Sequence, residues 1–260
     1  MSAPPPNQEA VKGPGILFVR SRIAPANKDI LSPSTLLHWY DKIHIPDVVS
    51  TSGIKSAFRF IDTAIDGADA EKVAPKTNTK PYLAMYPMQD LAFTNGDEFR
   101  GISVKSDVFP GGGAVYDFVE LEVWKGGIVG KTEKKHGAAK PKFILSVGIR
   151  PGTDVTEEKI EDFFDKQITA LATNQDYIRS LRFKLLFART NAQSRAFKGL
   201  PPATNAVEED ATKEPSTWLA VHEFAEMPAK DVVDGGCEWE KEVLVWRLDA
   251  VHGEGKFFDE

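Results

Sequence analysis

The two halves of the chain contain the same short motifs in the same order, and this repetition limits the fold more than any other feature of the sequence. The partners lie at nearly constant separations of roughly 120–140 residues. The matched pairs are YDK at 40–42 with FDK at 164–166, FRF from Phe58 with FKL from Phe183, YLAMY from Tyr82 with WLAVH from Trp218, and Trp124 with Trp246. Four matches in one order indicate an internal duplication.

The alternation of apolar and polar residues predicts the same succession of elements, βαββαβ, in each half. Strands are predicted at 15–23, 54–62, 81–90 and 115–124, and again at 142–150, 181–189, 217–227 and 237–251. Helices are predicted from Ser32 or Ser34 onward, at 90–102, from Thr156 to about Ser180, and at 228–233. The polar residues 190–216 form a long insertion, which is expected to be a lid or a mobile loop.

A single βαββαβ unit forms a four-stranded antiparallel sheet with both helices on one face, so its other face needs a cover. Two fused copies can cover each other, with the sheets packed face to face or joined into a barrel and the helices outside. We therefore predict an α+β protein made of two tandem ferredoxin-like repeats, which form one intramolecular pseudo-dimer. The predicted parts are a disordered arm at 1–14, repeats at 15–126 and 142–251, a linker at 127–141 and a tail at 252–260.

The composition narrows the class of partner. The net charge of −6 disfavours nucleic acid and anionic membranes as binding partners. The single cysteine, Cys237, excludes an internal disulfide and suits a reducing compartment. No run of about eighteen apolar residues is present to cross a membrane. These features predict a cytoplasmic protein.

The residues that could carry chemistry are concentrated in the stretch HWYDKIHIPDVVSTSGI at 38–54. Helical spacing predicts one mostly apolar face that contains Leu37, Tyr40, Asp41, His44 and Val48. Pro46 lacks an N–H group and disfavours helix at the residue before it, so a kink or break is expected just after His44. Nearby carbonyls and carboxylates would favour the protonated imidazole, whereas burial would favour the neutral one. In either case its charge could change near neutral pH.

The repeat offers an internal comparison for His44. When YDK is aligned with FDK, the position of His44 in the second half is occupied by Ile168. Because a hydrocarbon serves at the matching position, the imidazole is a candidate general acid or base, and a hydrogen-bonded structural histidine is the alternative. Proton transfer by such a group contributes about 10²–10⁴ in rate.

Other polar and aromatic residues could complete a site around His44. The predicted substrate-binding residues are Trp39, Tyr40, Tyr82 and Tyr86, which could line a pocket or pack in the core. The predicted supporting residues are Asp41, Asp47 and Glu120. The two aspartates could orient the imidazole, and a buried Glu120 would have a raised pKa and could act as an acid. Exposure to solvent is the alternative for these carboxylates.

Metal and nucleotide chemistry have little support in the sequence. His38 and His44 are about 240° apart around a helix, so they cannot chelate one ion. The chain has no G-x-G-x-x-G after a strand, no G-x-x-x-x-G-K-[ST], no H-E-x-x-H and no G-x-S-x-G. No metal site and no organic cofactor are therefore predicted.

The motif WYDKIHIPDV, followed by a short loop and a strand, resembles the EthD-like branch of the dimeric α+β barrel superfamily. The duplication, which covers roughly residues 15–251, is similar to the fused tandem form of that fold. The resemblance implies that a HIP-containing pattern occupies the first helix. Relatives of this fold include cofactor-free monooxygenases, polyketide cyclases and dehydratases, lactone isomerases, haem-dependent enzymes and proteins without known activity, so haem is not excluded.

Taken together, these features predict a cofactor-free acid–base enzyme of the dehydratase, cyclase or isomerase type. Its partner would be a hydrophobic small molecule, aromatic or polyketide-like, held between the helices and the sheet of the first repeat. A cofactor-independent monooxygenase and a non-catalytic small-molecule-binding protein are the alternatives. The pseudo-dimer could associate further into a homodimer.

Overall fold

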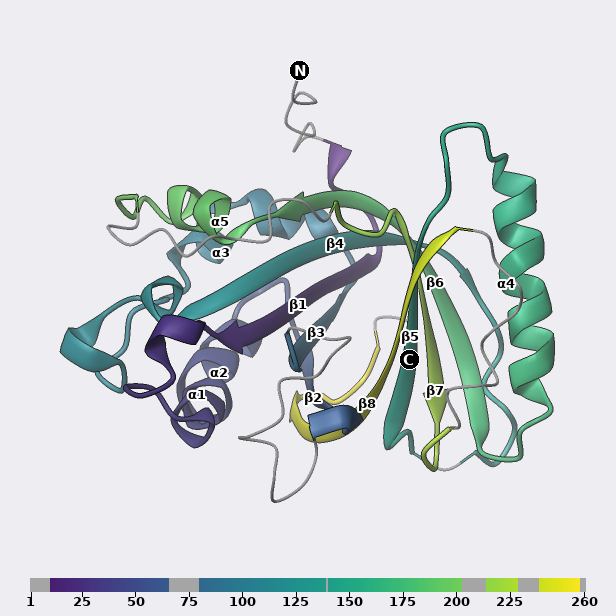
Figure 1. Ribbon diagram of the computed structural model, residues 1–260, viewed down its shortest axis with the longest axis horizontal. Coiled ribbons are helices and arrows are strands. Elements are labelled where there is room, and N and C mark those ends of the chain that lie inside the picture. The colour runs from purple at the N-terminus through teal and green to yellow at the C-terminus, as the bar shows by residue number, and fades with distance from the viewer. Residues whose placement is uncertain (1–9, 66–79, 139, 203–213, 229–238, 258–260) are drawn as a thin grey trace.

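The computed structural model describes residues 10–65, 80–138, 140–202, 214–228 and 239–257. Within these ranges, eight strands with antiparallel pairing close into one barrel, and helices pack on its outside (Figure 1). The strands are β1 (Gly15–Ile23), β2 (Ser56–Asp62), β3 (Tyr82–Met88), β4 (Val119–Lys131), β5 (Phe143–Arg150), β6 (Tyr177–Arg189), β7 (Trp218–Phe224) and β8 (Glu240–Gly253). The predicted α+β class is confirmed.

The strand order around the barrel is β1-β3-β2-β8-β5-β7-β6-β4. Within the first half the neighbours run β4-β1-β3-β2, and within the second half they run β8-β5-β7-β6. Two seams join the halves, because β2 pairs with β8 and β4 pairs with β6. Every strand therefore has a partner on both edges, which leaves no open sheet edge.

The helices lie on two sides of the barrel (Figure 1). One side carries α1 (Pro33–Trp39), a π-helical turn (Tyr40–His44), α2 (Ile45–Val49), α3 (Asp97–Gly101) and α5 (Asn191–Phe197). The other side carries α4 (Glu157–Ala172). Although α5 follows the sixth strand in sequence, it lies with the helices of the first half.

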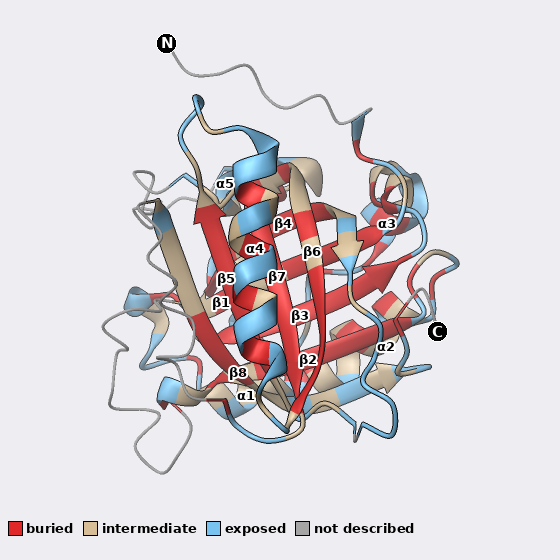
Figure 2. Ribbon diagram, turned by 90° about the vertical axis from the view of Figure 1, so that its right-hand side faces the viewer, coloured by how far each residue is buried: buried red, intermediate tan, exposed pale blue. Residues whose placement is uncertain are grey.

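The sequence of α4 explains both its start and its buried face. The Thr156 hydroxyl accepts a hydrogen bond from the backbone N–H of Lys159, which caps the first turn. Ile160, Phe164 and Leu171 recur at helical spacing and are buried, and they form the narrow buried stripe that Figure 2 shows along an otherwise exposed helix. The helix ends at Ala172, so the prediction that it runs to about Ser180 was wrong; a turn follows, and Tyr177 begins β6.

The barrel interior is a separate apolar cluster that both halves fill. It includes Phe18, Phe58, Trp124, Phe183 and Trp246, together with smaller side chains between them. Side chains of the alternate positions point outward and pack under the helices, because successive residues of a strand face opposite sides of the sheet. The outer face of the first-half strands belongs to the cluster that contains Leu17, Tyr86, Leu121 and Val123.

Several predicted boundaries differ from the structure. The segment 127–141, predicted as a linker, contains the end of β4 as far as Lys131, which pairs with β6. β8 extends to Gly253, beyond the boundary of the predicted tail at 252–260. The insertion 190–216 contains α5. Most of the helix predicted at 228–233 and residues 1–9 of the arm predicted at 1–14 lie outside the described residues. Val11 of that arm is buried.

Candidate functional site

A cavity of about 70 Å³ lies between the outer face of the first-half strands and the helices that cover it. Its walls are mainly aliphatic and aromatic, and they come from both halves of the chain. The lining residues are Leu17, Val19, Trp39, Tyr40, His44, Val48, Tyr86, Phe99, Ile102, Val104, Val115, Tyr116, Leu121, Val123, Arg189 and Lys198. Three of the four predicted substrate-binding aromatics and the predicted catalytic histidine are therefore brought together.

A π-helical turn places His44 at the cavity. The turn covers Tyr40–His44, and the backbone N–H of Ile45 donates to the carbonyl of Tyr40, five residues earlier. His44 and Ile45 both keep helical backbone angles, so the chain passes directly into α2 with Pro46 in its first turn. Of the predicted kink or break after His44, the break is absent: the helix changes its winding before the proline and continues. Such π turns are frequent at functional sites.

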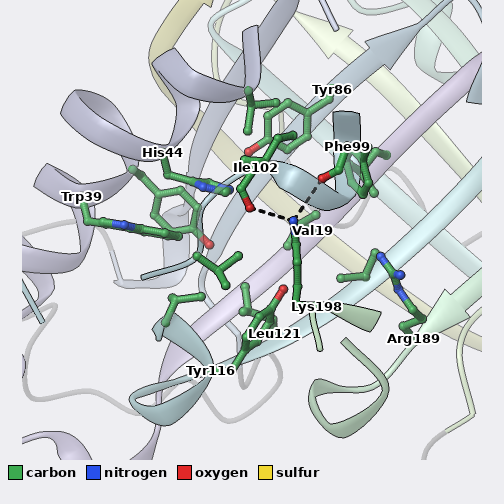
Figure 3. A pocket seen from close by; sticks show the side chains of 16 residues that line it. Val19, Trp39, His44, Tyr86, Phe99, Ile102, Tyr116, Leu121, Arg189 and Lys198 are labelled. Atoms are coloured by element: carbon green, nitrogen blue, oxygen red, sulfur yellow. Dashed lines mark hydrogen bonds between the residues drawn. The ribbon is translucent and has the colours of Figure 1, made fainter. Parts of the chain in front are cut away.

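The imidazole of His44 is held by two neighbours. Its ring stacks on Trp39, with centroids 4.4 Å apart and an interplanar angle of 12°. Its Nδ1 atom lies 3.3 Å from the carbonyl oxygen of Ser103. A carbonyl oxygen only accepts hydrogen bonds, so Nδ1 carries the proton and Nε2 of the neutral ring keeps a lone pair. Figure 3 shows the ring directed from its helix toward Ile102.

The charge state of His44 follows from its surroundings. Burial lowers the pKa of His44 to about 4, although the hydrogen bond to Ser103 raises it, and the nearby Lys198 ammonium lowers it further. The ring is therefore neutral at pH 7 and can accept a proton. It retains some accessible surface, since it forms part of the cavity wall.

The tyrosines around the cavity remain protonated at neutral pH. Burial raises the pKa of Tyr40 to about 12, and its hydroxyl donates to the Ser21 Oγ at 3.1 Å. Burial also raises the pKa of Tyr86, and of Tyr116 to about 12. These phenols can donate hydrogen bonds, but they are poor bases. Tyr82 is buried in the same apolar cluster, but it does not line the cavity.

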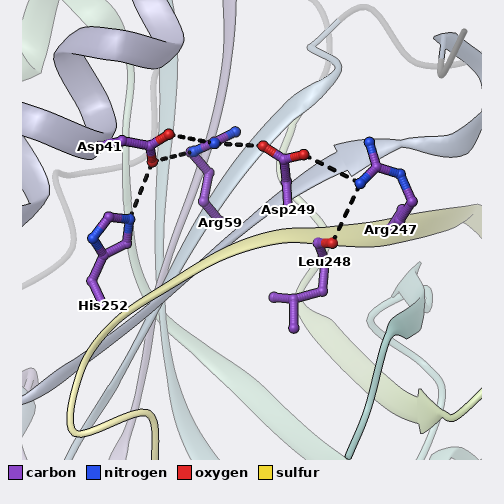
Figure 4. Close-up of polar contacts among 6 residues, drawn as sticks. All are labelled: Asp41, Arg59, Arg247, Leu248, Asp249 and His252. Atoms are coloured by element: carbon purple, nitrogen blue, oxygen red, sulfur yellow. Dashed lines mark hydrogen bonds and ion pairs between the residues drawn. The ribbon is translucent and has the colours of Figure 1, made fainter.

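The predicted supporting aspartates do not contact His44. Asp41 instead receives two hydrogen bonds from Arg59, at 2.7 and 2.6 Å, and lies 3.1 Å from His252 Nε2 (Figure 4). Burial alone would raise the pKa of Asp41, but Arg59 and His252 lower it overall. Arg59 also pairs with Asp249 of β8 at 2.5 Å, so this network ties the helical turn to a seam of the barrel. Asp47 is exposed.

Glu120 is buried, but it faces away from the cavity. It accepts a hydrogen bond of 2.6 Å from Arg22 Nε. It alternates with Leu121 along β4, and Leu121 lines the cavity, so the two side chains lie on opposite faces of the sheet. Glu120 is thus separated from His44 by the sheet.

Three polar contributors to the site were missed in the sequence. Ser103 supplies the carbonyl that fixes the His44 tautomer. Lys198, just after α5, donates to the carbonyls of Phe99, Arg100 and Ile102 at 3.0, 3.0 and 2.8 Å, and so fixes the backbone next to Ser103. Arg189, the last residue of β6, closes the far side of the cavity (Figure 3). A cation at the end of an apolar strand was the only local signal for Arg189.

The side chains available as metal ligands and the volume of the cavity limit which cofactors could bind. In the part of the chain that the structure describes, no group of three or more His, Cys, Asp or Glu side chains is arranged to hold a metal ion. Haem does not fit the cavity, whose volume of about 70 Å³ is well below the roughly 300–1,000 Å³ of sites for drug-sized ligands. No helix in the described ranges has the length and apolarity needed to cross a bilayer.

No protein-family model matches the chain. Core atranone cluster (CAC) protein 1 from Stachybotrys chlorohalonatus (strain IBT 40285) is 25% identical over 247 residues, which cover 94% of each chain. Among solved structures, a candidate monooxygenase from Fusobacterium nucleatum superimposes with a TM-score of 0.45 and 9% identity over 94% of this chain and 97% of its own. An anthrone oxidase-like protein superimposes with a TM-score of 0.45 and 11% identity over 94% of both chains. These identities and scores are too low to transfer a function.

Proposed function

We propose that the chain is a cofactor-free acid–base enzyme in which His44 moves a proton on a small, mainly apolar molecule. The observation that carries this proposal is a neutral imidazole, fixed in one tautomer by Ser103, in the wall of an apolar cavity. Nε2 is the basic atom in that tautomer. A ring that served only to pack would not need a wall with free space beside it.

The low pKa of His44 limits the chemistry. A base whose conjugate acid has a pKa of about 4 is weak, so the C–H group that it deprotonates has to be activated twice, for example by a carbonyl group and an aromatic ring on the same carbon. In this step Nε2 accepts the proton and the electron pair of the broken C–H bond remains on the substrate as an enolate. The imidazolium then returns the proton to another atom, which isomerises the substrate, or to a departing hydroxide, which leaves as water.

The size of the cavity sets a condition on the substrate. About 70 Å³ accommodates a few water molecules or a small organic fragment. A polycyclic substrate requires the wall formed by residues 99–104 to move outward. That wall is held by the contacts of Lys198, which come from outside the first half.

We also propose that the fold is a fused tandem pair of ferredoxin-like repeats of the EthD-like kind. The same strand order in both halves supports this proposal. The motif pairs Phe58 with Phe183 and Trp124 with Trp246 support it as well, because all four side chains enter the barrel interior. The relative named for the atranone cluster is similar over nearly the whole chain, which supports a small molecule as the substrate.

Cofactor-independent oxygenation begins with the same deprotonation, and the enolate then reacts with O2. Oxygen uptake during turnover separates the two reactions. Isomerisation and dehydration consume no oxygen, whereas oxygenation consumes one O2 for each substrate molecule. A non-catalytic binding protein would neither consume oxygen nor accelerate proton exchange.

The test is solvent deuterium exchange, because it detects proton abstraction without knowledge of the product. 2-Tetralone and the monocyclic phenylacetone in D2O buffer at pH 7 serve as mainly apolar ketones with a C–H group between a carbonyl and an aromatic ring, and deuterium incorporation is followed by mass spectrometry. The wild type should accelerate exchange over buffer, and His44→Ala should reduce that acceleration at least about a hundredfold. His38→Ala, which changes an exposed residue of the same helix, should keep wild-type exchange. Equal exchange in wild type and His44→Ala would reject the proposal.

A further inference from the structure

Arg189 is a buried cation without an anionic partner. Only 7% of the residue is exposed, and its Nε and Nη1 atoms are buried with no hydrogen-bond partner. No carboxylate of the described residues forms an ion pair with it. Burial lowers the pKa of Arg189 from its ordinary value, although the phenol of Tyr116 raises it. A buried charge in this situation is costly, and it is usually paired with an acid or a ligand.

Aromatic rings account for only part of the environment of Arg189. Its guanidinium carbon lies 4.0 Å from the centroid of the Phe197 ring and 5.8 Å from that of Phe187. Such stacking uses the face of the guanidinium plane. The N–H groups lie in that plane, so Nε and Nη1 remain available to donate. A carboxylate accepts from a guanidinium in this in-plane direction, often through two parallel bonds.

Two more basic side chains lie near Arg189, and of these Lys198 lines the cavity whereas Lys125 does not. Lys125 is 1% exposed, lies 5.2 Å from the Phe187 centroid and donates to the Thr94 hydroxyl at 2.7 Å. Burial lowers the pKa of Lys125 to about 7 and that of Lys198 to about 8, and in both cases the charge of Arg189 lowers the pKa further. Among the described residues, no carboxylate offsets this repulsion. The positive charge is therefore unbalanced in the protein alone.

We propose that the Arg189 end of the cavity binds the carboxylate of an organic acid, with Arg189 as the direct partner and Lys125 and Lys198 as the source of a positive field. The inference rests on the proposed small-molecule role of the cavity and adds the substrate class. Figure 3 shows Arg189 on one side of the cavity and His44 with Trp39 on the other, with Lys198 between them. A ligand would thus present its acid group to Arg189 and its apolar body to the aromatic wall.

The probes are benzoate and benzamide, which have nearly the same shape but differ in charge. Ligand-observed NMR titration of the wild type should give at least about tenfold tighter binding of benzoate, because a charge-assisted hydrogen bond is stronger than a neutral one. In Arg189→Met the two affinities should become equal. Arg182→Met is the matched control, because it removes the same charge from the same strand but changes a residue that pairs with Glu161 and Asp165 on α4. This control should keep the preference.

The unfolding temperature provides a second test, which applies even if Arg189→Met binds neither benzoate nor benzamide. Since the charge is unbalanced, Arg189→Met should unfold at a higher temperature than the wild type without ligand, and benzoate should stabilise only the wild type. Equal affinities of the wild type for benzoate and benzamide, or an unchanged preference in Arg189→Met, would overturn the inference. The benzoate preference reports only the acid site and deuterium exchange reports only proton transfer, so failure of one is distinguishable from failure of the other.

Discussion

The Nδ1 atom of His44 lies 3.3 Å from the carbonyl oxygen of Ser103, so a loop that follows α3 fixes the tautomer of a side chain on the first helix. The two residues are far apart in sequence. The backbone of the loop is held in turn by Lys198, which comes from the second half of the chain. The position of the basic Nε2 atom of His44 thus depends on three segments of the chain, which contain His44, Ser103 and Lys198.

His44 should titrate far below an ordinary histidine. With a pKa of about 4, its ring should stay neutral and protonated on Nδ1 throughout the range from pH 7 to pH 5. Two-dimensional ¹⁵N NMR of the imidazole nitrogens reports both the tautomer and the midpoint. A midpoint near 6.5, or a proton on Nε2, would contradict this geometry.

Lys198→Met should disturb His44 without touching it. The variant loses three hydrogen bonds to the loop carbonyls and removes the positive charge that lowers the pKa of His44. We expect the His44 midpoint to rise through the lost charge; a break of the Nδ1 bond to Ser103, seen as a proton on Nε2, would instead lower it. The same NMR titration measures both effects. If Lys198 only fills space, the His44 midpoint will be the same in the variant and the wild type.

The stability of the fold should fall in acid partly because of His44. Between pH 6.5 and about 4 the unfolded chain binds a proton on this residue that the folded chain does not bind. The free energy of unfolding therefore decreases as the pH falls through this window and levels off below it, with a contribution on the order of 3 kcal/mol. Urea denaturation of wild type and His44→Leu at pH 7 and pH 4 measures it. The acid-induced loss should be smaller in the variant; an equal loss in both proteins would be inconsistent with the low pKa.

Asp41→Asn should destabilise the protein by about 2 kcal/mol, because it removes the carboxylate that shares Arg59 with Asp249. The loss of stability is limited because Arg59 keeps its second partner, Asp249, and because Asp41 is partly exposed. Asp47→Asn is the matched control on an exposed position of the same helical segment and should be nearly neutral. Chemical denaturation at neutral pH compares the two, and similar costs would show that the network of Figure 4 adds little.

Gly15→Ala should destabilise the barrel where β1 meets β4. A Cβ atom at this position would lie 2.1 Å from the backbone oxygen of Gly126, so a strand has to shift. A cost of about 1–3 kcal/mol is expected. Gly101→Ala, where a Cβ would have no neighbour within 4 Å, should be neutral or slightly stabilising. Thermal unfolding of the two variants measures this difference. Equal melting temperatures would contradict the close approach of β1 and β4 at Gly15.

The sequence predicted the parts of the site that depend on local periodicity. His44, Tyr40 and Tyr86 were found because helical and strand spacing place them on apolar faces, and the structure places all three at the cavity. The strand at Gly15–Ile23 was predicted with its observed bounds. Whether these residues act as proposed stays a prediction.

Arg189 could not be found from spacing, because β6 changes face along its length. Phe183 enters the barrel interior, whereas Phe187 packs in the outer cluster under the helices, although four residues of regular strand would put both on one side. The pairing of β4 with β6 shifts between Lys125 and Gly126, where β6 has one more residue than β4, and this accounts for the change. A pattern of alternating residues does not reveal such a bulge, so the position of Arg189 was not predictable.

The π turn also alters the comparison between the halves. A π turn accommodates one additional residue, so under the proposed repeat His44 corresponds to Gln167 rather than to Ile168. Gln167 is buried, and its Oε1 lies 3.0 Å from Nε2 of His222, whose other nitrogen contacts Ser180. In the second half, the imidazole of His222 is therefore enclosed and hydrogen-bonded on both nitrogens, whereas in the first half the imidazole of His44 lies beside a cavity.

The additional residue in the Tyr40–His44 turn is what lets Trp39 and His44 meet. The two residues are five apart, so a regular α-helix would point their side chains about 140° away from each other. The wider π turn takes up the additional residue and brings both rings to the same side of the helix. The local irregularity of the helix is thus what allows two aromatic rings to face the same small space.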